Sequence, residues 1–174
     1  MIHRVLTLIT IGLLGFTHLR ADPSWDISWD IAKVGDKPYP VSGTATDGTA
    51  VSLEAFKGRP VLLYFFATKA GAGTQELRMI KQYVWSKFEH SGLVIIGVGR
   101  EAQMPELTAL AKSMQITFPL LPDPEKEIFR HFATRGHPRT YLVGKDGTIK
   151  LTSLGYSDDD IDRISDSIAR ELKQ

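Results

Sequence analysis

The 174-residue sequence contains no cysteine. Without a thiol, the chain cannot form disulfides, attack with a thiolate, hold an iron–sulfur cluster, bind zinc through sulfur or carry a lipid on cysteine. Thiol–disulfide exchange and thiol peroxidase chemistry are therefore excluded for this chain alone, because serine and threonine hydroxyls form no disulfides. We predict that the protein is not a thiol enzyme and that it uses no cofactor.

An excess of charge of one sign is also missing. The 21 basic and 20 acidic side chains give a formal net charge of +1, so no overall field attracts nucleic acid, and we predict no such partner. The five histidines lack the paired spacing of metal ligands, which predicts no metal site. Gly97-Val98-Gly99 lacks the remaining glycine of a dinucleotide fingerprint, and no phosphate loop or hydrolase elbow is present.

The apolar run near the start of the chain is short. Met1-Ile2-His3-Arg4 is basic, and Val5–Phe16 is mostly apolar and uncharged. A membrane helix needs about 20 apolar residues, whereas this length, followed by the small residue Ala21, is typical of a secretory signal. We predict a signal peptide over residues 1–21, an exported protein that is periplasmic or secreted, and no membrane span after cleavage. An uncleaved anchor or a buried first helix is the alternative.

Residues 22–40 are predicted to form a linker or N-terminal extension. This stretch contains three prolines, and the pattern Ser-Trp-Asp occurs in it twice, at residues 24–26 and 28–30. Proline at both ends favours extended backbone. Packing of Trp25 and Trp29 onto their own domain is favoured over docking to a partner.

From residue 41 onward, strand-like and helix-like segments alternate. Val61–Ala67 is apolar throughout and lies between chain breakers, which is typical of a central strand buried on both faces. The expected elements, in order, are a hairpin over 41–53, a strand over 61–67, a helix over 76–90, a strand over 93–98, a helix over 104–114, a short strand over 118–121, a helix over 124–132, a hairpin around 145–148 and a final helix capped by Ser157. This order predicts one α/β domain over 41–174, with three layers, a mixed central sheet flanked by helices and an N-terminal hairpin extension.

Four segments carry a family resemblance. They are Val34–Pro38, Asp47–Leu63, Phe65–Thr68, and Gly136–Val143 with the Lys145-Asp146-Gly147 turn that follows. In this order and spacing, they resemble the thioredoxin-like superfamily, specifically the exported thiol–disulfide oxidoreductases of the peroxiredoxin-related redoxin group. The resemblance implies a thioredoxin-like fold over about residues 34–174.

The chain departs from that family where its active site belongs. The family has W-C-G-P-C after the segment Phe65-Phe66-Ala67-Thr68, and this chain has Lys69-Ala70-Gly71-Ala72-Gly73. The two cysteine positions are Ala70 and Gly73, and a peroxiredoxin-type alignment places the reactive cysteine at Thr74 instead. Since neither alignment yields a thiol, we predict a degenerate site with no catalytic residue.

The resemblance also implies that a groove remains around this site. In the family, a cis proline, here Pro138, faces the start of the helix after the lost motif, and the residue before that proline offers backbone groups to an extended peptide. We therefore predict a peptide-binding groove with added positive charge from Lys69, Arg135 and Arg139. Its residues are Lys69, Gly71, Ala72, Thr74, His137 and Pro138.

Simpler interpretations of these residues stay open. Pro138 is then only a turn that the fold requires, and Lys69 and His137 are solvated surface residues. Gly71 and Gly73 are then remnants of a lost active site.

Three functions are compatible with the sequence. The first is a non-catalytic envelope protein that binds a peptide or a partner protein through the degenerate groove. The second is a scaffold or regulator of a thiol–disulfide or antioxidant system, in which another chain supplies the sulfur. The third, an unrelated enzyme that uses Thr74, His137 or Glu76, has the least support, because no nucleophile–base pair follows from the spacing.

Overall fold

The computed structural model describes residues 29–69, 71–155 and 157–174. The predicted signal peptide, Trp25 and Ala70 lie outside these ranges. In chain order, the elements are β1 (Ser42–Thr44), β2 (Ala50–Ser52), the 3₁₀ turn η2 (Leu53–Phe56), β3 (Val61–Ala67), α1 (Gly71–Met79), the π-helical turn η3 (Ile80–Trp85), α2 (Ser86–Phe88), β4 (Val94–Arg100), α3 (Met104–Met114), β5 (Leu120–Asp123), the 3₁₀ turn η4 (Phe129–His131), β6 (Arg139–Val143), β7 (Ile149–Leu154) and α4 (Asp158–Lys173).

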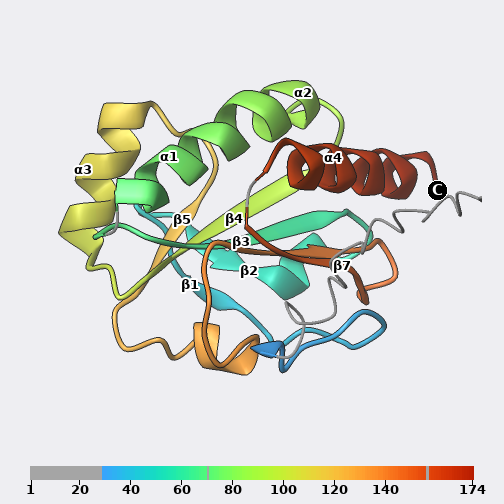
Figure 1. Cartoon of the computed structure of the whole chain (residues 1–174), viewed down its shortest axis with the longest axis horizontal. Coiled ribbons are helices and arrows are strands. Elements are labelled where there is room, and N and C mark those ends of the chain that lie inside the picture. Colours follow the sequence, from blue (N-terminus) through green and yellow to red (C-terminus); the bar gives the residue numbers. More distant parts are fainter. Residues whose placement is uncertain (1–28, 70, 156) are drawn as a thin grey trace, which may run out of the picture.

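A five-stranded sheet forms the centre of the molecule, with the strand order β5-β4-β3-β6-β7. Strand β3 runs parallel to β4 and antiparallel to β6, and all of its residues are buried. β5 lies parallel to β4, and β7 lies antiparallel to β6. The predicted mixed sheet, with the apolar strand at its centre, is confirmed (Figure 1).

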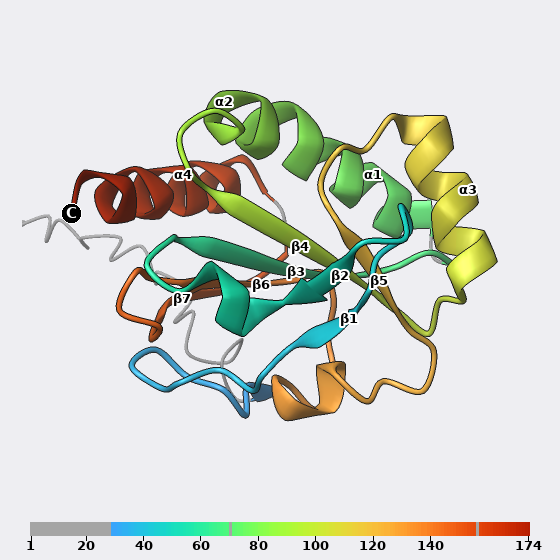
Figure 2. The same ribbon diagram turned by 180° about the vertical axis from the view of Figure 1, so that it is seen from behind.

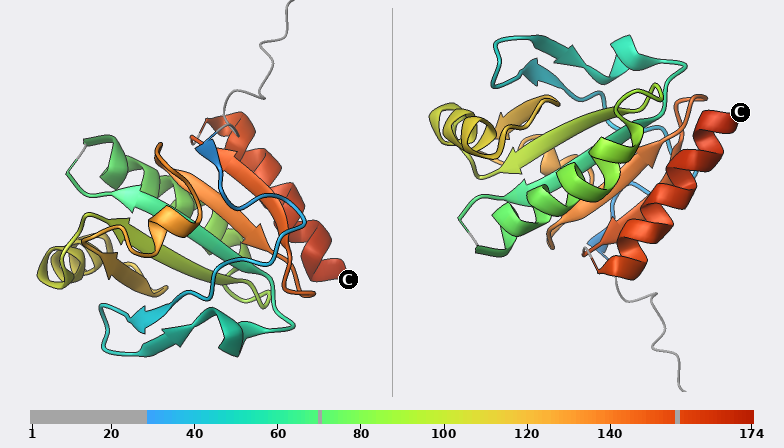
Figure 3. Two further views of the ribbon diagram at one scale, coloured as in Figure 1. Left: turned by 90° about the horizontal axis from the view of Figure 1, so that it is seen from below. Right: turned by 90° about the horizontal axis from the view of Figure 1, so that it is seen from above.

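Alternate side chains of β3 enter two separate cores. Leu62, Tyr64 and Phe66 face the continuous helical stretch α1–η3–α2 together with α3 and α4, and Figure 3 shows α1–α2 and α4 lying across this face of the sheet. Val61, Leu63 and Phe65 face the β1–β2 hairpin and the turns η2 and η4. The three layers are therefore helices, sheet, and a layer of hairpin and turns (Figure 2).

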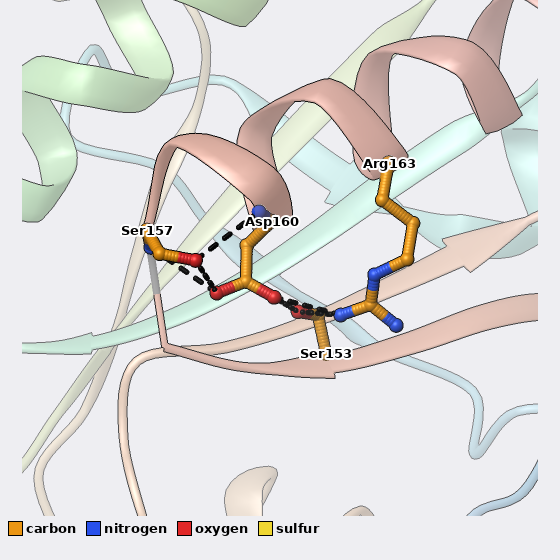
Figure 4. A network of polar contacts seen from close by, with 4 residues as sticks. All are labelled: Ser153, Ser157, Asp160 and Arg163. Carbon is orange, nitrogen blue, oxygen red and sulfur yellow. Dashed lines mark hydrogen bonds and ion pairs between the residues drawn. The ribbon is translucent and has the colours of Figure 1, made fainter. Parts of the chain in front are cut away.

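The last helix begins at the predicted cap. Ser157 accepts a hydrogen bond from the backbone N–H of Asp160, and the Asp160 carboxylate accepts from the backbone N–H of Ser157, which completes a capping box. The same carboxylate accepts from Ser153 over 3.1 Å and from Arg163 over 2.8 Å (Figure 4). Burial opposes ionisation of Asp160, but these hydrogen bonds outweigh it and lower the pKa of the carboxyl group. Asp160 therefore stabilises the start of α4.

The predicted helix over residues 124–132 is wrong. Only Phe129–His131 forms a helical turn, and the short strand before it is Leu120–Asp123, two residues later than predicted. The buried Asp123 carboxylate accepts from the backbone N–H groups of Ile128 and Phe129 over 3.0 and 2.9 Å. Lys126 has φ +58°, which no right-handed helix accommodates. The carboxylate therefore holds this segment as a loop.

The N-terminal segment before β1 packs against the domain. The backbone N–H of Ala32 donates to the Phe132 carbonyl over 3.1 Å, and that of Gly35 donates to the Ile149 carbonyl over 2.8 Å. Within the ranges that the structure describes, no helix is long and apolar enough to cross a membrane.

Candidate functional site

The predicted groove residues lie at one end of the sheet. Phe65 of β3 pairs with Arg139 of β6, and Ala67 pairs with Arg100 of β4. The carboxyl ends of β3 and β4 therefore meet the start of β6, which Pro138 precedes. The helix α1 starts just beyond β3, so the sheet topology brings the ends of the groove segments together.

The individual residues differ in exposure. Lys69 is exposed, Thr74 and His137 are half-buried, and Pro138 is buried. The His137–Pro138 peptide is cis, as the resemblance implies. Gly71, Ala72 and Gly73 form the first turn of α1. Binding of a peptide by these residues stays a prediction.

Arg100 holds the ring of His137. Its Nη1 lies 3.0 Å from Nδ1 of His137, and because a guanidinium group can only donate, Nδ1 accepts. Burial lowers the pKa of His137, the neighbouring charge of Arg100 lowers it further, and Glu101 acts in the opposite direction. The neutral ring, protonated on Nε2, is therefore favoured at this end of the sheet.

Glu101 balances the positive charges near His137. It accepts from Nη2 of Arg100 over 3.3 Å and from Nζ of Lys126 over 3.0 Å. The hydrogen bond from Lys126 has the largest effect and lowers the pKa of Glu101. Burial opposes it with the second-largest effect, and the charges of Arg100 and Lys69 lower the pKa further. Lys69 therefore contributes to the electrostatic field of this cluster. Among the described residues, no three His, Asp or Glu side chains lie together in a way that could hold a metal ion.

An open pocket of about 420 Å³ lies beside Arg100. Phe129 and Ala133 are buried and Ile31 is 50% exposed, which gives the pocket an apolar floor. The Arg100 guanidinium lies over the Phe129 ring, 4.8 Å from its centroid. The complete lining is Ile31, Arg100, Glu125, Lys126, Phe129, Arg130, Ala133 and Thr134.

Arg139 does not contribute surface charge to the groove, which corrects the sequence-based prediction. Its side chain is 1% exposed and forms an ion pair with Asp30, which is 3% exposed. Its Nε donates to the Arg135 carbonyl over 2.9 Å, and the Tyr141 hydroxyl lies 2.6 Å from the same Asp30 carboxylate. Arg139 therefore ties the N-terminal segment to the loop before Pro138.

Arg135 is exposed, as its predicted role requires, but its guanidinium lies over the Trp29 ring at 4.1 Å from the centroid. The Trp29 carbonyl accepts from the backbone N–H of Thr134 over 2.9 Å. Packing of Trp29 onto its own domain is thus confirmed, while Trp25 lies outside the described residues.

Arg100 and Glu101 are site residues that sequence reasoning missed. Arg100 is the last residue of the buried strand β4, which lies beside the central strand, and Glu101 follows it directly. Because polar groups at the carboxyl ends of neighbouring parallel strands converge on one edge of a sheet, this position was the available signal.

The comparisons with known proteins agree with this architecture. The model of the AhpC/TSA family matches residues 34–152. The chain is similar to chloroplastic peroxiredoxin Q from Sedum lineare, with 27% identity over 124 residues that cover 67% of this chain and 66% of the relative. It is similar to the same protein from Gentiana triflora, with 30% identity over 129 residues that cover 69% of this chain and 59% of the relative.

Solved structures share most of the fold. A putative protein disulfide isomerase from Bacteroides thetaiotaomicron superimposes with a TM-score of 0.78 and 28% identity, covering 84% of this chain and 94% of its own. The resemblance drawn from the sequence motifs is therefore confirmed. The chain belongs to the AhpC/TSA family, as a member with a thioredoxin-like fold and no cysteine.

Proposed function

We propose that this protein is a non-catalytic member of its family that binds a peptide or a partner protein at the degenerate site. The observation that carries the proposal is the apolar-floored pocket beside the Arg100–His137 pair, at the end of the sheet where the family's thiols belong. No thiol is present to react there, so the surfaces around the site are left to act by binding alone.

The pocket suits an apolar side chain of an extended segment. Phe129 and Ala133 supply a rigid buried floor, and Ile31 supplies an exposed wall. The basic side chains of the rim are already paired, Arg100 and Lys126 with Glu101 and Arg130 with Glu127 over 3.4 Å. Burial of apolar surface is therefore expected to dominate affinity, at about 25 cal/mol for each Å² removed from water.

The neutral His137 ring complements that apolar contact. With Nδ1 accepting from Arg100, its Nε2–H is the donor that remains for a carbonyl of the bound segment. Export follows from the predicted signal peptide over residues 1–21. We therefore place the protein in the periplasm or outside the cell, where extended and unfolded segments of exported proteins are available ligands.

Peptides selected from a random display library on the full chain test this function. Their affinity, measured by fluorescence anisotropy, is expected to fall with Ile31→Ser, which removes the exposed wall, and with His137→Glu. Val34→Ser is the matched control, because Val34 is 61% exposed on the same segment and does not line the pocket. The proposal is contradicted by equal losses for Ile31→Ser and Val34→Ser, or by selected peptides that are insensitive to both Ile31→Ser and His137→Glu.

Family membership supports a second candidate, a scaffold or regulator of a thiol–disulfide or antioxidant system. Restoring sulfur with Ala70→Cys and Gly73→Cys tests how much of the thiol site persists. Insulin reduction by the double variant, but not by the natural chain, would support this second function. Turnover by the natural chain would contradict both proposals.

A further inference from the structure

A second pocket, of about 260 Å³, lies at the opposite end of the sheet from the degenerate site. It is formed where the loop before β1, the turn η2, the start of β3 and the hairpin after β6 converge, on the side of the molecule away from α3 (Figure 2). β3 separates the two ends by its whole length, about 20 Å at about 3.3 Å per residue. This pocket therefore shares no residue with the proposed peptide groove.

The floor of this pocket is apolar. Leu53, Val61 and Val143 are buried, and the half-buried Phe56 packs against the same core. Pro38 and Pro40, which lack backbone N–H groups, complete the apolar lining. A ligand seated here would bury apolar surface on rigid elements of the fold.

The rim of the pocket carries uncompensated positive charge. Its two acids are already paired: Glu54 forms an ion pair with Lys57, and Asp146 accepts from Nζ of Lys150 over 2.6 Å. Lys37 and Arg59 also line the rim, and neither has an acidic partner among the described residues.

Two contacts hold the guanidinium group of Arg59, which lines the pocket. Its Nε donates to the Gly92 carbonyl over 3.1 Å, and its guanidinium lies 5.8 Å from the centroid of the Phe56 ring. These contacts leave the two Nη groups as donors, and a guanidinium presents them in a geometry that matches a carboxylate.

We propose that this pocket binds a small amphipathic carboxylate, with its apolar part on the floor and its carboxylate between Lys37 and Arg59. The volume of about 260 Å³ is slightly below the range of about 300–1,000 Å³ that is typical of drug-sized ligands. The ligand is accordingly a single ring or a short aliphatic chain with one negative charge.

Titration of the full chain with octanoate tests the site, with octanamide as the neutral probe of the same shape. Calorimetry gives the affinities, and amide chemical shifts locate the probes. We expect octanoate to shift the amides of Leu53, Phe56 and Gly144, and to bind about fivefold more tightly than octanamide at low salt, as two exposed ion pairs imply. Added salt should reduce that difference.

Three variants separate this site from other basic surfaces. The combined substitutions Lys37→Gln and Arg59→Gln should bring octanoate to the affinity of octanamide. Lys33 is an exposed lysine of the same segment that does not line this pocket, so Lys33→Gln should leave binding unchanged. Ile31→Ser, in the pocket beside Arg100, should also leave it unchanged. Equal affinity of the two probes, amide shifts confined to the groove end, or an unchanged affinity in the double variant would overturn the proposal, whatever the outcome of the peptide experiments.

Discussion

The buried ion pair between Asp30 and Arg139 gives the sharpest prediction for stability. The two side chains are 3% and 1% exposed, so Asp30→Ala leaves a guanidinium inside the protein with no opposite charge. Removing one partner of a buried pair costs about 3–5 kcal/mol. In a domain of this size, 1 kcal/mol moves the melting temperature by about 2–4 °C, so we expect a decrease of about 6–20 °C.

The expected loss of stability in Asp30→Ala comes from the Arg139 charge that stays buried without a partner. The intact ion pair contributes much less than this to the free energy of unfolding. Burial raises the pKa of Asp30, and the hydrogen bond with Tyr141 and the charge of Arg139 only partly oppose this effect. Ionising Asp30 in the fold therefore has a net cost. Replacing both partners, with Asp30→Ala and Arg139→Met, should thus recover most of the lost free energy of unfolding, because no charge stays buried and the Tyr141 hydroxyl keeps the Phe132 carbonyl as a partner at 2.9 Å.

Urea unfolding of the natural chain, both single variants and the double variant gives the coupling free energy directly. Glu127→Ala is the control, because it breaks an ion pair with Arg130 in which the two side chains are 72% and 62% exposed, and it should cost at most about 1 kcal/mol. The reasoning is refuted if Asp30→Ala costs no more than Glu127→Ala, or if the double variant loses the full sum of the single losses.

Two further predictions concern the groove end and the last helix. Because burial and Arg100 lower the pKa of His137 below its usual 6.5, the unfolded chain binds this proton more readily. The contribution of the neutral His137 ring to stability should be complete above about pH 6.5. It should be lost as the pH falls through the lower pKa that His137 has in the folded state. His137→Asn, which keeps an acceptor for Arg100, should flatten the decline in unfolding free energy between about pH 7 and 5; an unchanged slope would assign the decline to other groups. Ser157→Ala should lower the free energy of unfolding by about 1 kcal/mol in urea, whereas Ser157→Asn, an equally good cap, should stay near the natural chain; equal losses would mean that the cap is not the cause.

The hydrophobic pattern of the sequence was sufficient to predict the central sheet, but it gave the wrong structure for residues 124–132. The apolar run Val61–Ala67 predicts a strand buried on both faces, and every residue of it is buried. The later segment places Ile128, Phe129 and Phe132 at spacings that a helix also uses. Two features prevent a helix there. The Asp123 carboxylate accepts hydrogen bonds from two backbone N–H groups, and Lys126 has a positive φ. Hydrophobic periodicity indicates neither of them.

The same limit applies to the site. The groove residues were predicted from motif resemblance, and the sheet topology places their segments at one end. Arg139 was expected to add positive charge to the groove, whereas its side chain is buried in an ion pair. Its partner Asp30 is 109 residues away in the sequence, inside a Ser-Trp-Asp pattern with no visible link to β6, so no local rule could pair the two.

The basic side chains at the two ends of the sheet differ in whether they have acidic partners. This difference explains why we propose a peptide at one end and a small carboxylate at the other. Near His137, Glu101 accepts from both Arg100 and Lys126, so bringing a further anion there would displace an existing partner and gain little. At the opposite end, Lys37 and Arg59 line the pocket and form no ion pair with an acid among the described residues. A bound anion would therefore form new ion pairs there without displacing an existing partner. Raised salt should consequently weaken octanoate binding while leaving peptide binding at the groove nearly unchanged, since screening acts on the uncompensated charges.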